Sequence, residues 1–471
     1  MKQKLLLLLL QAFFALGINA EVVSGSCGDE IIYSLDTDSH ILTIEGNGEM
    51  ENYGATGAPW YHYRQFVEKV IMSGSIENIS MYAFNQCTNL TSIQIPSSVK
   101  TIYEWAFLGC SKLEDISIPN SVEYVNGAAF EGCTAIRNPL FNDRLFILMP
   151  KHYKGEYEIP VGIERICGDA FYGCDYLESV RIPNSVTTIE GGAFQFSGLT
   201  SIDIPNSVMW IGGYAFRECR KLTSVKIPNS VTEIDWHTFE GCSNLTYADI
   251  PNSITCIGSE AFMECSNLAN VNIPNSVTAI ENKAFYNCWN LKSINFPNSL
   301  ESVGQNAFYG CGIKTVYWNL NKRTTYLSSF TSVKELYFGD DVTTVYNAFH
   351  NSYLEKVVLG KNVKEIADHA FNIVGGELYI TGNTDIECSS AAFDGWPEQA
   401  VLYVPEGTRS YYITTEPWKR FGTITEYDAT GITVTTSLNA IPSSIYDLSG
   451  RKLNTLTKGI NVVGNKKVLV R

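Results

Sequence analysis

The segment Leu222-Thr-Ser-Val-Lys-Ile-Pro-Asn-Ser-Val-Thr-Glu-Ile234, followed by Phe239 and Cys242, decides the fold of this chain. Apolar and polar residues alternate around Val225 and Ile227, a pattern that predicts a short strand with one buried face. The side chains of Val225 and Ile227 are therefore expected to point inward, and the polar residues beside them outward.

The rest of this segment predicts a chain that turns a corner. Pro228 has no N–H to donate and ends the strand, and Asn229-Ser230 supply turn residues. A second short apolar pair follows at Val231 and Ile234. Phe239 and Cys242 then face inward before the next strand begins, which completes one coil.

The same pattern recurs along most of the chain. It is marked by thirteen phenylalanines spaced mostly by 22 or 23 residues, with two spacings of 41: Phe84, Phe107, Phe130, Phe171, Phe194, Phe216, Phe239, Phe262, Phe285, Phe308, Phe349, Phe371 and Phe393. One coil cannot bury its own apolar face, so stability must come from stacking on neighbouring coils. We predict a mainly β repeat solenoid, a leucine-rich-repeat-like horseshoe or arc. Each coil has one short parallel strand and short helical or irregular turns.

These motifs resemble a known family. The Ile-Pro-Asn-Ser-Val stretch, the Ala-Phe pair and the Cys three residues after Phe are similar to the BspA-type leucine-rich repeats of bacterial surface proteins, over about residues 76–405. The stretch 24–60 resembles the β-rich entry segment of that family. After Cys311 the repeats depart from this pattern: they lose the Ile-Pro-Asn-Ser signature, and Ser352, Val374 and Trp396 stand in place of the Cys.

The domain organisation follows from these boundaries. Residues 1–20 carry Lys2 and Lys4 before an apolar run and are expected to be a secretory signal, since the run falls short of a membrane span of about 18 to 20 residues. Residues 21–75 form a β-rich cap and residues 76–430 a solenoid of about 13 coils. A hairpin-like insertion is expected near 138–160, and residues 431–471 form a small C-terminal β module.

The charge of the chain restricts its partners. The formal net charge is −15, which disfavours nucleic acid and anionic membranes because both need a basic surface. We therefore expect no nucleic-acid partner and no membrane insertion of the mature chain. The sign changes in residues 431–471, where six basic residues face Asp447 alone.

The thirteen cysteines fall into a pattern that favours packing over disulfides. Nine occupy the same repeat position and should form one column of reduced, buried thiols: Cys87, Cys110, Cys133, Cys174, Cys219, Cys242, Cys265, Cys288 and Cys311. Metal ligation is the sharper alternative, but close Cys pairs are absent. No nucleotide-binding or hydrolase motif is present, and the six histidines are scattered. We expect no enzyme activity, no metal and no cofactor.

The outward strand positions are the candidate binding surface, because a stack of coils presents an extended sheet face. This row runs Gln94, Ser117, Arg181, Asp203, Lys226, Asp249, Asn272, Asn295, Tyr317, Tyr337, Val358, Tyr379 and Tyr403. Tyrosine is enriched at interfaces, so the candidate ligand-binding residues are Tyr317, Tyr337, Tyr379, Tyr403, Arg181 and Lys226. The alternative is that the rings only shield the sheet face or pack under a neighbouring segment.

The C-terminal segment contains Tyr446-Asp-Leu-Ser-Gly-Arg451 and Lys458-Gly-Ile460, and the Gly464-Asn465 pair signals a hairpin. It resembles the short C-terminal β module of exported and surface proteins of the Bacteroidetes, some of which use it for sorting. A small module that packs on the last coil is the alternative.

Together these features favour adhesion or recognition at the bacterial cell surface, associated with the outer membrane. The resemblance implies a partner such as a host protein, a matrix protein or another cell. Two alternatives remain open: glycan binding by the tyrosines, and a structural envelope spacer without a specific ligand.

Overall fold

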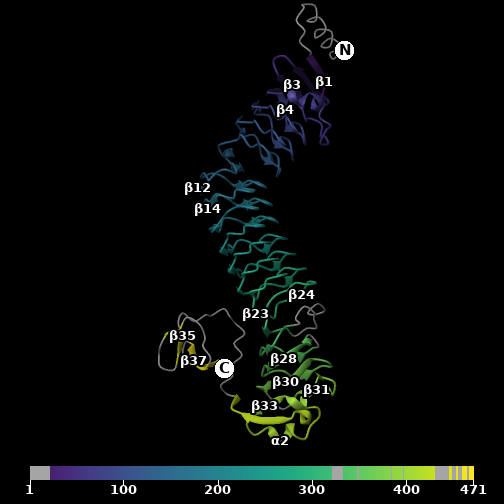
Figure 1. The fold of residues 1–471 in the computed structure, drawn as a ribbon, viewed down its shortest axis with the longest axis vertical. Helices are drawn as coiled ribbons and strands as arrows, with labels where there is room; N and C mark the ends of the chain where they lie inside the picture. Colours follow the sequence, from purple (N-terminus) through teal and green to yellow (C-terminus); the bar gives the residue numbers. More distant parts are fainter. Residues whose placement is uncertain are drawn as a thin grey trace, which may run out of the picture. The chain divides into compact units, whose positions relative to one another are not determined.

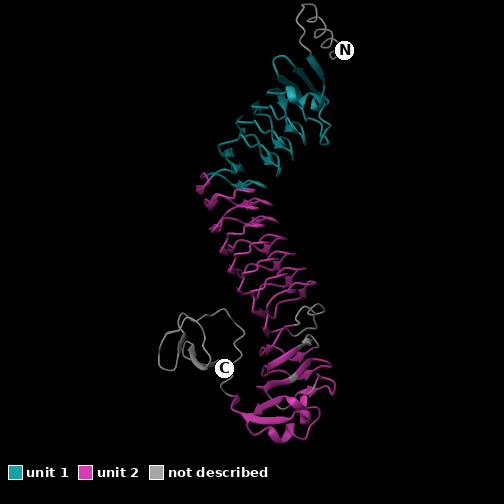
Figure 2. Cartoon of the chain, viewed as in Figure 1, with its two compact units in different colours: residues 1–153, 162–171 teal, residues 154–161, 172–471 magenta. Residues whose placement is uncertain are grey.

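The computed structural model describes residues 22–320, 332–346, 349–382, 385–395 and 397–429, and four short strands between residues 445 and 470. The expected signal segment 1–20 lies outside the described residues. The chain divides into two compact units, residues 1–153 with 162–171 and residues 154–161 with 172–471 (Figure 2). Most of each unit is a succession of short parallel strands joined by turns (Figure 1).

The first unit begins with an antiparallel sheet that becomes a parallel ladder. Strands β1 (Val22–Ser26), β2 (Glu30–Asp36) and β3 (Ile41–Gly48) pair antiparallel. Strand β3 then pairs in parallel with β4 (Lys69–Ile76), and the ladder continues through β6 (Ser92–Gln94) to β8 (Asp115–Ile116). The entry segment thus covers the open edge of the first coil.

Most coils that the structure describes carry a second strand as well as the expected one. In the first unit, β5 (Asn78–Ile79), β7 (Thr101–Ile102) and β9 (Tyr124–Val125) form a second parallel ladder. In the second unit the equivalent strand is β18 (Glu233–Ile234), which follows β17 (Ser224–Lys226). The second apolar pair of the repeat therefore forms a two-residue strand of its own.

A hairpin lies within the range 138–160 in which the sequence indicates an insertion. Strands β10 (Leu140–Phe141) and β11 (Leu145–Leu148) pair antiparallel, and β11 pairs in parallel with β13 (Arg165–Ile166). The next apolar-alternating run, β12 (Gly155–Glu158), pairs in parallel with β14 (Leu177–Arg181). That run is thus an ordinary ladder strand and not a hairpin arm.

Two ladders run through the second unit. The first-strand ladder continues from β12 and β14 through the isolated bridges Arg181–Asp203–Lys226. Its further strands are β17, β19 (Tyr247–Asp249), β21 (Asn270–Val271), β23 (Ser293–Phe296), β25 (Thr315–Trp318), β26 (Glu335–Phe338), β28 (Phe349–Leu359), β30 (Phe371–Ile380), β33 (Val401–Pro405) and β34 (Thr423–Tyr427). The second-strand ladder consists of three hydrogen-bonded stretches: β15 (Thr188–Ile189) with β16 (Trp210–Ile211); β18, β20 (Cys256–Ile257), β22 (Ala279–Ile280) and β24 (Ser302–Val303); and β27 (Thr344–Val345), β29 (Glu365–Ile366) and β31 (Glu387–Cys388).

The late coils differ because the turn that carries the cysteine is lost. Strands β28 and β30 begin at the phenylalanine position and run on without a break, and β32 (Phe393–Asp394) pairs with β30. Ser352 and Val374, which replace the thiol, lie inside these strands, whereas Trp396 lies outside the described residues. The pairing of β28 with β30 shifts register twice, between Phe349 and Tyr353 and between Leu354 and Lys356, but residues 356–359 pair in the register of the earlier coils.

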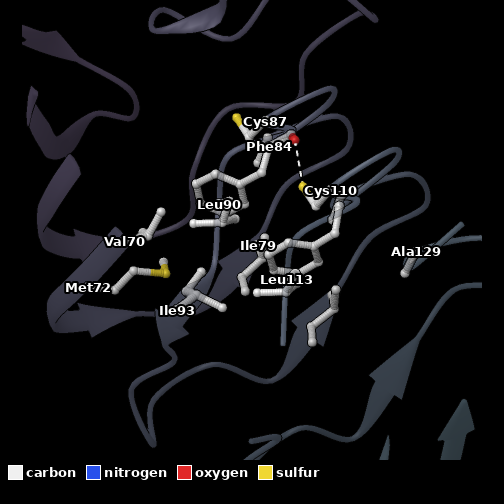
Figure 3. Packing of buried hydrophobic residues seen from close by; sticks show 14 of the residues in the cluster. Val70, Met72, Ile79, Phe84, Cys87, Leu90, Ile93, Cys110, Leu113 and Ala129 are labelled. Carbon is white, nitrogen blue, oxygen red and sulfur yellow. Dashed lines mark hydrogen bonds between the residues drawn. The ribbon is translucent and has the colours of Figure 1, made fainter. Parts of the chain in front are cut away.

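A column of stacked phenylalanines forms the centre of the core. Neighbouring rings lie nearly parallel, with centroids 5.4 Å apart for Phe216–Phe239 and 5.3 Å for Phe239–Phe262. The same stacking joins Phe84 to Phe107 in the first unit, where Leu90, Ile93 and Leu113 pack beside it (Figure 3). Ring stacking adds to the burial of apolar area and fixes the spacing of the coils.

Backbone hydrogen bonds tie the same turns together. The Phe239 N–H donates to the Ala261 carbonyl of the next coil across 2.8 Å. The turn places residues two before and two after the phenylalanine in the left-handed region, with φ of 55° at His237 and 70° at Gly241. At Gly241 a Cβ would lie 2.7 Å from the Glu218 carboxylate carbon, so glycine relieves both the backbone strain and the crowding.

Aromatic residues close the core at each end. Trp60 follows the entry sheet and precedes η2 (Tyr61–Phe66); it is fully buried, stacks on Phe84 and donates its Nε1–H to the Ala83 carbonyl across 2.7 Å. At the other end Trp418 and Phe421 meet Phe393 edge-on. They lie near η4 (Pro397–Gln399), α2 (Arg409–Tyr412) and η5 (Trp418–Arg420). These aromatic caps keep water from the last rings of the column.

The C-terminal segment contains four antiparallel strands. In sheet order they are β36 (Lys452–Leu453), β35 (Ile445–Asp447), β37 (Gly459–Val463) and β38 (Lys466–Val470). Strands β37 and β38 pair on either side of the Gly464-Asn465 turn signal, which itself lies outside the described residues.

Candidate functional site

The outward row follows the register expected from the repeat. Asn295, Tyr317, Tyr337 and Val358 are successive partners in the first-strand ladder, and the register continues through Tyr379, Tyr403 and Thr425. Neighbouring parallel strands lie about 4.8 Å apart, so the tyrosine side chains project in one line from the sheet. We call Tyr317, Tyr337, Tyr379 and Tyr403 the tyrosine ladder.

The ladder consists of two stacked pairs. The rings of Tyr317 and Tyr337 have centroids 5.1 Å apart, and those of Tyr379 and Tyr403 lie 4.3 Å apart and nearly parallel. Tyr427 of β34 meets Tyr379 edge-on at 5.6 Å. Stacking on a regular sheet fixes these side chains before any partner arrives.

Lys356 links the two pairs across the coil that lacks a tyrosine. Its Nζ lies 5.7 Å from the centroid of the Tyr337 ring and 5.2 Å from that of Tyr379. Both distances allow attraction between the ammonium and the ring faces. The cation thus fills the gap that Val358 leaves in the aromatic row.

Glutamates two residues upstream fix the tyrosine hydroxyls. Tyr337 donates to Glu335 across 3.1 Å, and Tyr379 donates to Glu377 across 2.9 Å. Burial raises the pKa of Tyr337, and the Glu335 carboxylate raises it further. The Tyr337 hydroxyl therefore stays protonated, and its hydrogen bond orients Glu335 along the sheet.

The members of the ladder differ in exposure. Tyr317, Tyr337 and Tyr403 are half-buried, whereas Tyr379 is only 5% exposed. Tyr317 and Tyr337 are therefore the better candidates for direct contact. Tyr379 acts mainly as the base on which Tyr403 and Tyr427 pack.

Arg181 and Lys226 lie on the same row but in another environment. Backbone pairing places Glu158, Arg181, Asp203, Lys226 and Asp249 side by side, so charge alternates along five neighbouring coils. The Arg181 Nη1 lies 4.0 Å from the Glu158 carboxylate, and both side chains are well exposed. The opposite charges of neighbouring side chains largely cancel, so Arg181 and Lys226 are weak candidates for an anion-binding site.

Arg181 also lines a groove on this face with a volume of about 540 Å3. Small serines, Ser179 and Ser201, lie between the longer charged side chains and form part of its lining. The coils from Asp249 to Asn295 separate this groove from the tyrosine ladder. The structure therefore places the six predicted residues on one row without bringing them together at one point.

Sequence reasoning missed the charged neighbours of the ladder. Lys356, Glu335 and Glu377 occupy one shared position of the late strands, two residues before the row of tyrosines. The alternation Glu-Lys-Glu at that position was a usable signal. Tyr427 was missed because the repeat motif ends before it.

The cysteines of the column occupy equivalent positions in successive coils. All thirteen cysteines are free, and eight of the nine in the column are buried. Burial raises the pKa of Cys87 and of Cys219 to about 12, so neither supplies a thiolate nucleophile at neutral pH. Over the part of the chain that the structure describes, no group of three or more His, Cys, Asp or Glu side chains could hold a metal ion. Within the same residues, no helix has the length and apolar character needed to cross a membrane.

One protein family matches the sequence of this chain. The sequence model described as BspA type Leucine rich repeat region matches in six copies, over residues 59–149, 155–269 and 255–374. A search of curated proteins found no match.

Several solved structures are similar to this chain. A leucine-rich repeat protein from Eubacterium ventriosum is 23% identical over 62% of this chain and 96% of its own, with a TM-score of 0.43. A leucine rich cell surface protein from Faecalibacterium prausnitzii is 24% identical over 72% of this chain and 95% of its own, with a TM-score of 0.37. A leucine-rich repeat protein from Bacteroides ovatus is 21% identical over 85% of this chain and 99% of its own, with a TM-score of 0.40.

Proposed function

Because the chain belongs to the BspA-type leucine-rich repeat family, we propose that it is a recognition protein of the bacterial cell surface. In this proposal the chain is exported by its N-terminal segment and binds an extracellular protein through the outward face of the first-strand ladder. The partner is a host protein, a matrix protein or a protein on another cell. We propose no catalytic role and no cofactor.

The observation that carries this proposal is the tyrosine ladder with Lys356 at its centre. Tyrosine offers a large contact area and a polar edge, and it loses little conformational entropy on binding. Stacking and the hydroxyl bonds to Glu335 and Glu377 have already restricted these side chains in the free protein. A pre-ordered aromatic row of this kind reduces the entropy lost when a partner binds.

The orientation of the rings favours a protein partner over a glycan. Sugars bind aromatic residues by stacking C–H groups on an open ring face. In this ladder Tyr317 and Tyr337 stack on each other, as do Tyr379 and Tyr403, and Lys356 lies between the pairs. The ring faces inside each stacked pair are covered, an arrangement that favours a protein partner over a sugar.

The experiment that tests this proposal compares treatments of the target. Labelled mature chain is bound to mammalian cells after protease treatment, after mild periodate oxidation of surface glycans, or after neither. We expect protease to remove binding and periodate to leave it. Loss with periodate alone would support the glycan alternative, and no binding to untreated cells or matrix would support a structural spacer.

The role of the C-terminal module is a separate proposal. We propose that residues 431–471 direct the protein to, or retain it at, the outer membrane. Deletion of this segment should release the protein into the medium, as measured by immunoblotting of cell and supernatant fractions. Unchanged retention at the surface would favour a module that only packs on the last coil.

A further inference from the structure

A second groove lies away from the first-strand face, beside the second-strand ladder. Its volume is about 400 Å3, and it spans three successive coils. The residues that line it are Glu233, Ile234, Asp235, Trp236, His237, Cys256, Gly258, Ser259 and Glu281. Nothing in the tyrosine ladder or in the proposed function uses this part of the molecule.

Acidic residues alternate with glycines along the part of the coils that forms the groove. The residue directly after the second strand is, in six successive coils, Glu190, Gly212, Asp235, Gly258, Glu281 and Gly304. A Cβ at Gly258 would lie 2.7 Å from the Ile234 carbonyl oxygen, so the coils pack too closely there for any side chain. Gly258 therefore places no side chain between Asp235 and Glu281, which lie in the coils before and after it.

Trp236 forms an aromatic wall of this groove. Its side chain is 47% exposed, although tryptophan is usually well buried. The indole packs against Gly213, where a Cβ would lie 2.7 Å from the indole nitrogen, and the Tyr214 ring meets it edge-on at 4.4 Å. The ring is therefore held in place while about half of its surface stays open.

The groove carries an excess of negative charge. Across the described ranges, the Glu233, Asp235 and Glu281 carboxylates have no lysine or arginine nitrogen within 4.0 Å. The Glu281 carboxylate is fixed by the Ser259 N–H at 3.0 Å and the Ser259 hydroxyl at 2.8 Å.

The two other titratable groups of the lining do not offset this charge. The Nδ1 of His237 lies 2.7 Å from the Glu240 carboxylate and 3.5 Å from that of Glu260, so this histidine is already paired. Burial, helped by the Glu281 and Glu233 carboxylates, raises the pKa of the Cys256 thiol to about 11. Cys256 therefore stays neutral, and the groove remains anionic at neutral pH.

The separated carboxylates and the exposed Trp236 indole determine which kind of cation the groove can bind. A metal ion needs several ligands converging on one point, and these carboxylates do not converge in that way. A large organic cation needs separated carboxylates and an aromatic face. The planar guanidinium stacks on indole and donates to carboxylates from its edge, which suits the groove better than the compact ammonium of lysine.

We propose that this groove binds an arginine side chain of an extracellular protein. The guanidinium lies against the open part of Trp236, and its N–H groups donate to the Glu281 and Glu233 carboxylates. The site is independent of the tyrosine ladder and gives the protein a second contact surface.

The test uses the full mature chain and a fluorescein-labelled peptide, Gly-Ser-Arg-Ser-Gly, measured by fluorescence anisotropy. The matched probe has citrulline in place of arginine, which keeps the shape and removes the charge. We expect saturable binding of the arginine peptide, weaker binding of its lysine analogue and no binding of the citrulline peptide. Trp236→Ala and Glu233→Gln should each raise the Kd by about threefold or more.

Matched variants separate the groove from general acidity. Glu387→Gln removes a carboxylate at the equivalent position of β31, and Trp289→Ala removes another exposed tryptophan; both should leave the Kd unchanged. Tyr337→Ser should also leave it unchanged, so failure of the tyrosine ladder would not affect this result. Glu233 is exposed, and Glu233→Gln therefore remains informative if Trp236→Ala fails to fold.

Four results would overturn the proposal. Equal affinity for the arginine and citrulline peptides would exclude recognition of charge. If Glu233→Gln left the Kd unchanged, the arginine peptide would bind outside this groove. The same would hold if Glu387→Gln weakened its binding as much as Glu233→Gln does. Absence of saturable binding to the wild-type chain would exclude the site altogether.

Discussion

The thiol of Cys242 donates a hydrogen bond to the carbonyl oxygen of Phe216, one coil earlier, across 3.1 Å. The same carbonyl also accepts the backbone N–H of Cys219 at 3.2 Å, so both of its lone pairs are used. The arrangement recurs in six other thiols: Cys110, Cys133, Cys219, Cys265, Cys288 and Cys311. Cysteine suits this position because it is small and apolar and still carries a weak donor.

Replacing Cys242 should therefore lower stability. Cys242→Ala removes the donor and leaves a small void, and we expect the free energy of unfolding to fall by about 1–2 kcal/mol. Cys242→Ser should lose less, because Ser197 already occupies the same position in another coil, where its hydroxyl lies 3.3 Å from the Cys219 sulfur. Urea unfolding followed by far-UV circular dichroism measures both.

Cys256→Ala is the control for this prediction, since Cys256 is half-buried and outside the column. Its unfolding midpoint should stay close to that of the wild type. A midpoint for Cys242→Ala equal to that of the wild type would show that the column contributes no stability.

The buried thiols also predict a loss of stability at alkaline pH. Burial raises the pKa of Cys219 from 9.0 to about 12, while bonds from Ser197 oppose that shift only in part. Between these two values the unfolded chain releases the proton and the folded chain keeps it, so the free energy of unfolding falls as pH rises. Cys219→Ser should show a smaller fall in urea midpoint between pH 8 and pH 10.5 than the wild type. An equal fall in urea midpoint for Cys219→Ser and the wild type would show that Cys219 does not cause the loss of stability at alkaline pH.

A buried ion pair should make one coil sensitive to acid. Glu240 is 8% exposed and accepts two bonds from Arg217, at 2.7 and 3.1 Å, and one contact with His237 at 2.7 Å. Burial alone would raise its pKa, but the bonds from Arg217 and His237 outweigh burial and hold the pKa of Glu240 below its usual value. This carboxylate thus contributes stability at neutral pH that is lost as pH falls through its pKa.

Glu240→Gln should lower the free energy of unfolding at pH 7 by about 1–3 kcal/mol. Its stability should also change less between pH 5 and pH 3 than that of the wild type, as measured by urea unfolding at each pH. Glu164→Gln, which breaks the exposed pair with Arg144, is the control and should cost about 0–1 kcal/mol. If the free energy of unfolding of Glu240→Gln changed with pH as much as that of the wild type, Glu240 would not be the cause of the acid sensitivity.

The repeat pattern alone was sufficient to predict the core and the outward row. Val225 and Ile227 are buried as alternation requires, and the phenylalanine and cysteine positions form columns because identical coils stack in register. The row of tyrosines was found by the same argument, since parallel pairing brings equivalent positions together even where the cysteine is lost.

Features that depend on neighbouring coils could not be predicted in the same way. The second strand, as in Glu233–Ile234, has only two residues and shows no alternation. The role of Lys356 depends on rings one coil before and one coil after it. The groove at Trp236 depends on how closely Gly258 and Gly213 let adjacent coils approach, which no single repeat reveals.

The central claim is that the tyrosine ladder is the recognition surface, and a pair of matched double variants tests it. Tyr317→Ser with Tyr337→Ser removes the more exposed stacked pair of the ladder. Tyr286→Ser with Tyr309→Ser removes a stacked pair of equal ring separation, 5.2 Å against 5.1 Å, that lies on the turns after the phenylalanines. Both proteins must first show the circular dichroism spectrum of the wild type.

Binding of each labelled protein to an immobilised extracellular-matrix extract is then measured over a range of concentrations. We expect the ladder variant to lose about tenfold or more in apparent affinity, as for interface residues that dominate binding, and the turn variant to bind like the wild type. Equal affinities for the ladder variant and the wild type would contradict the account.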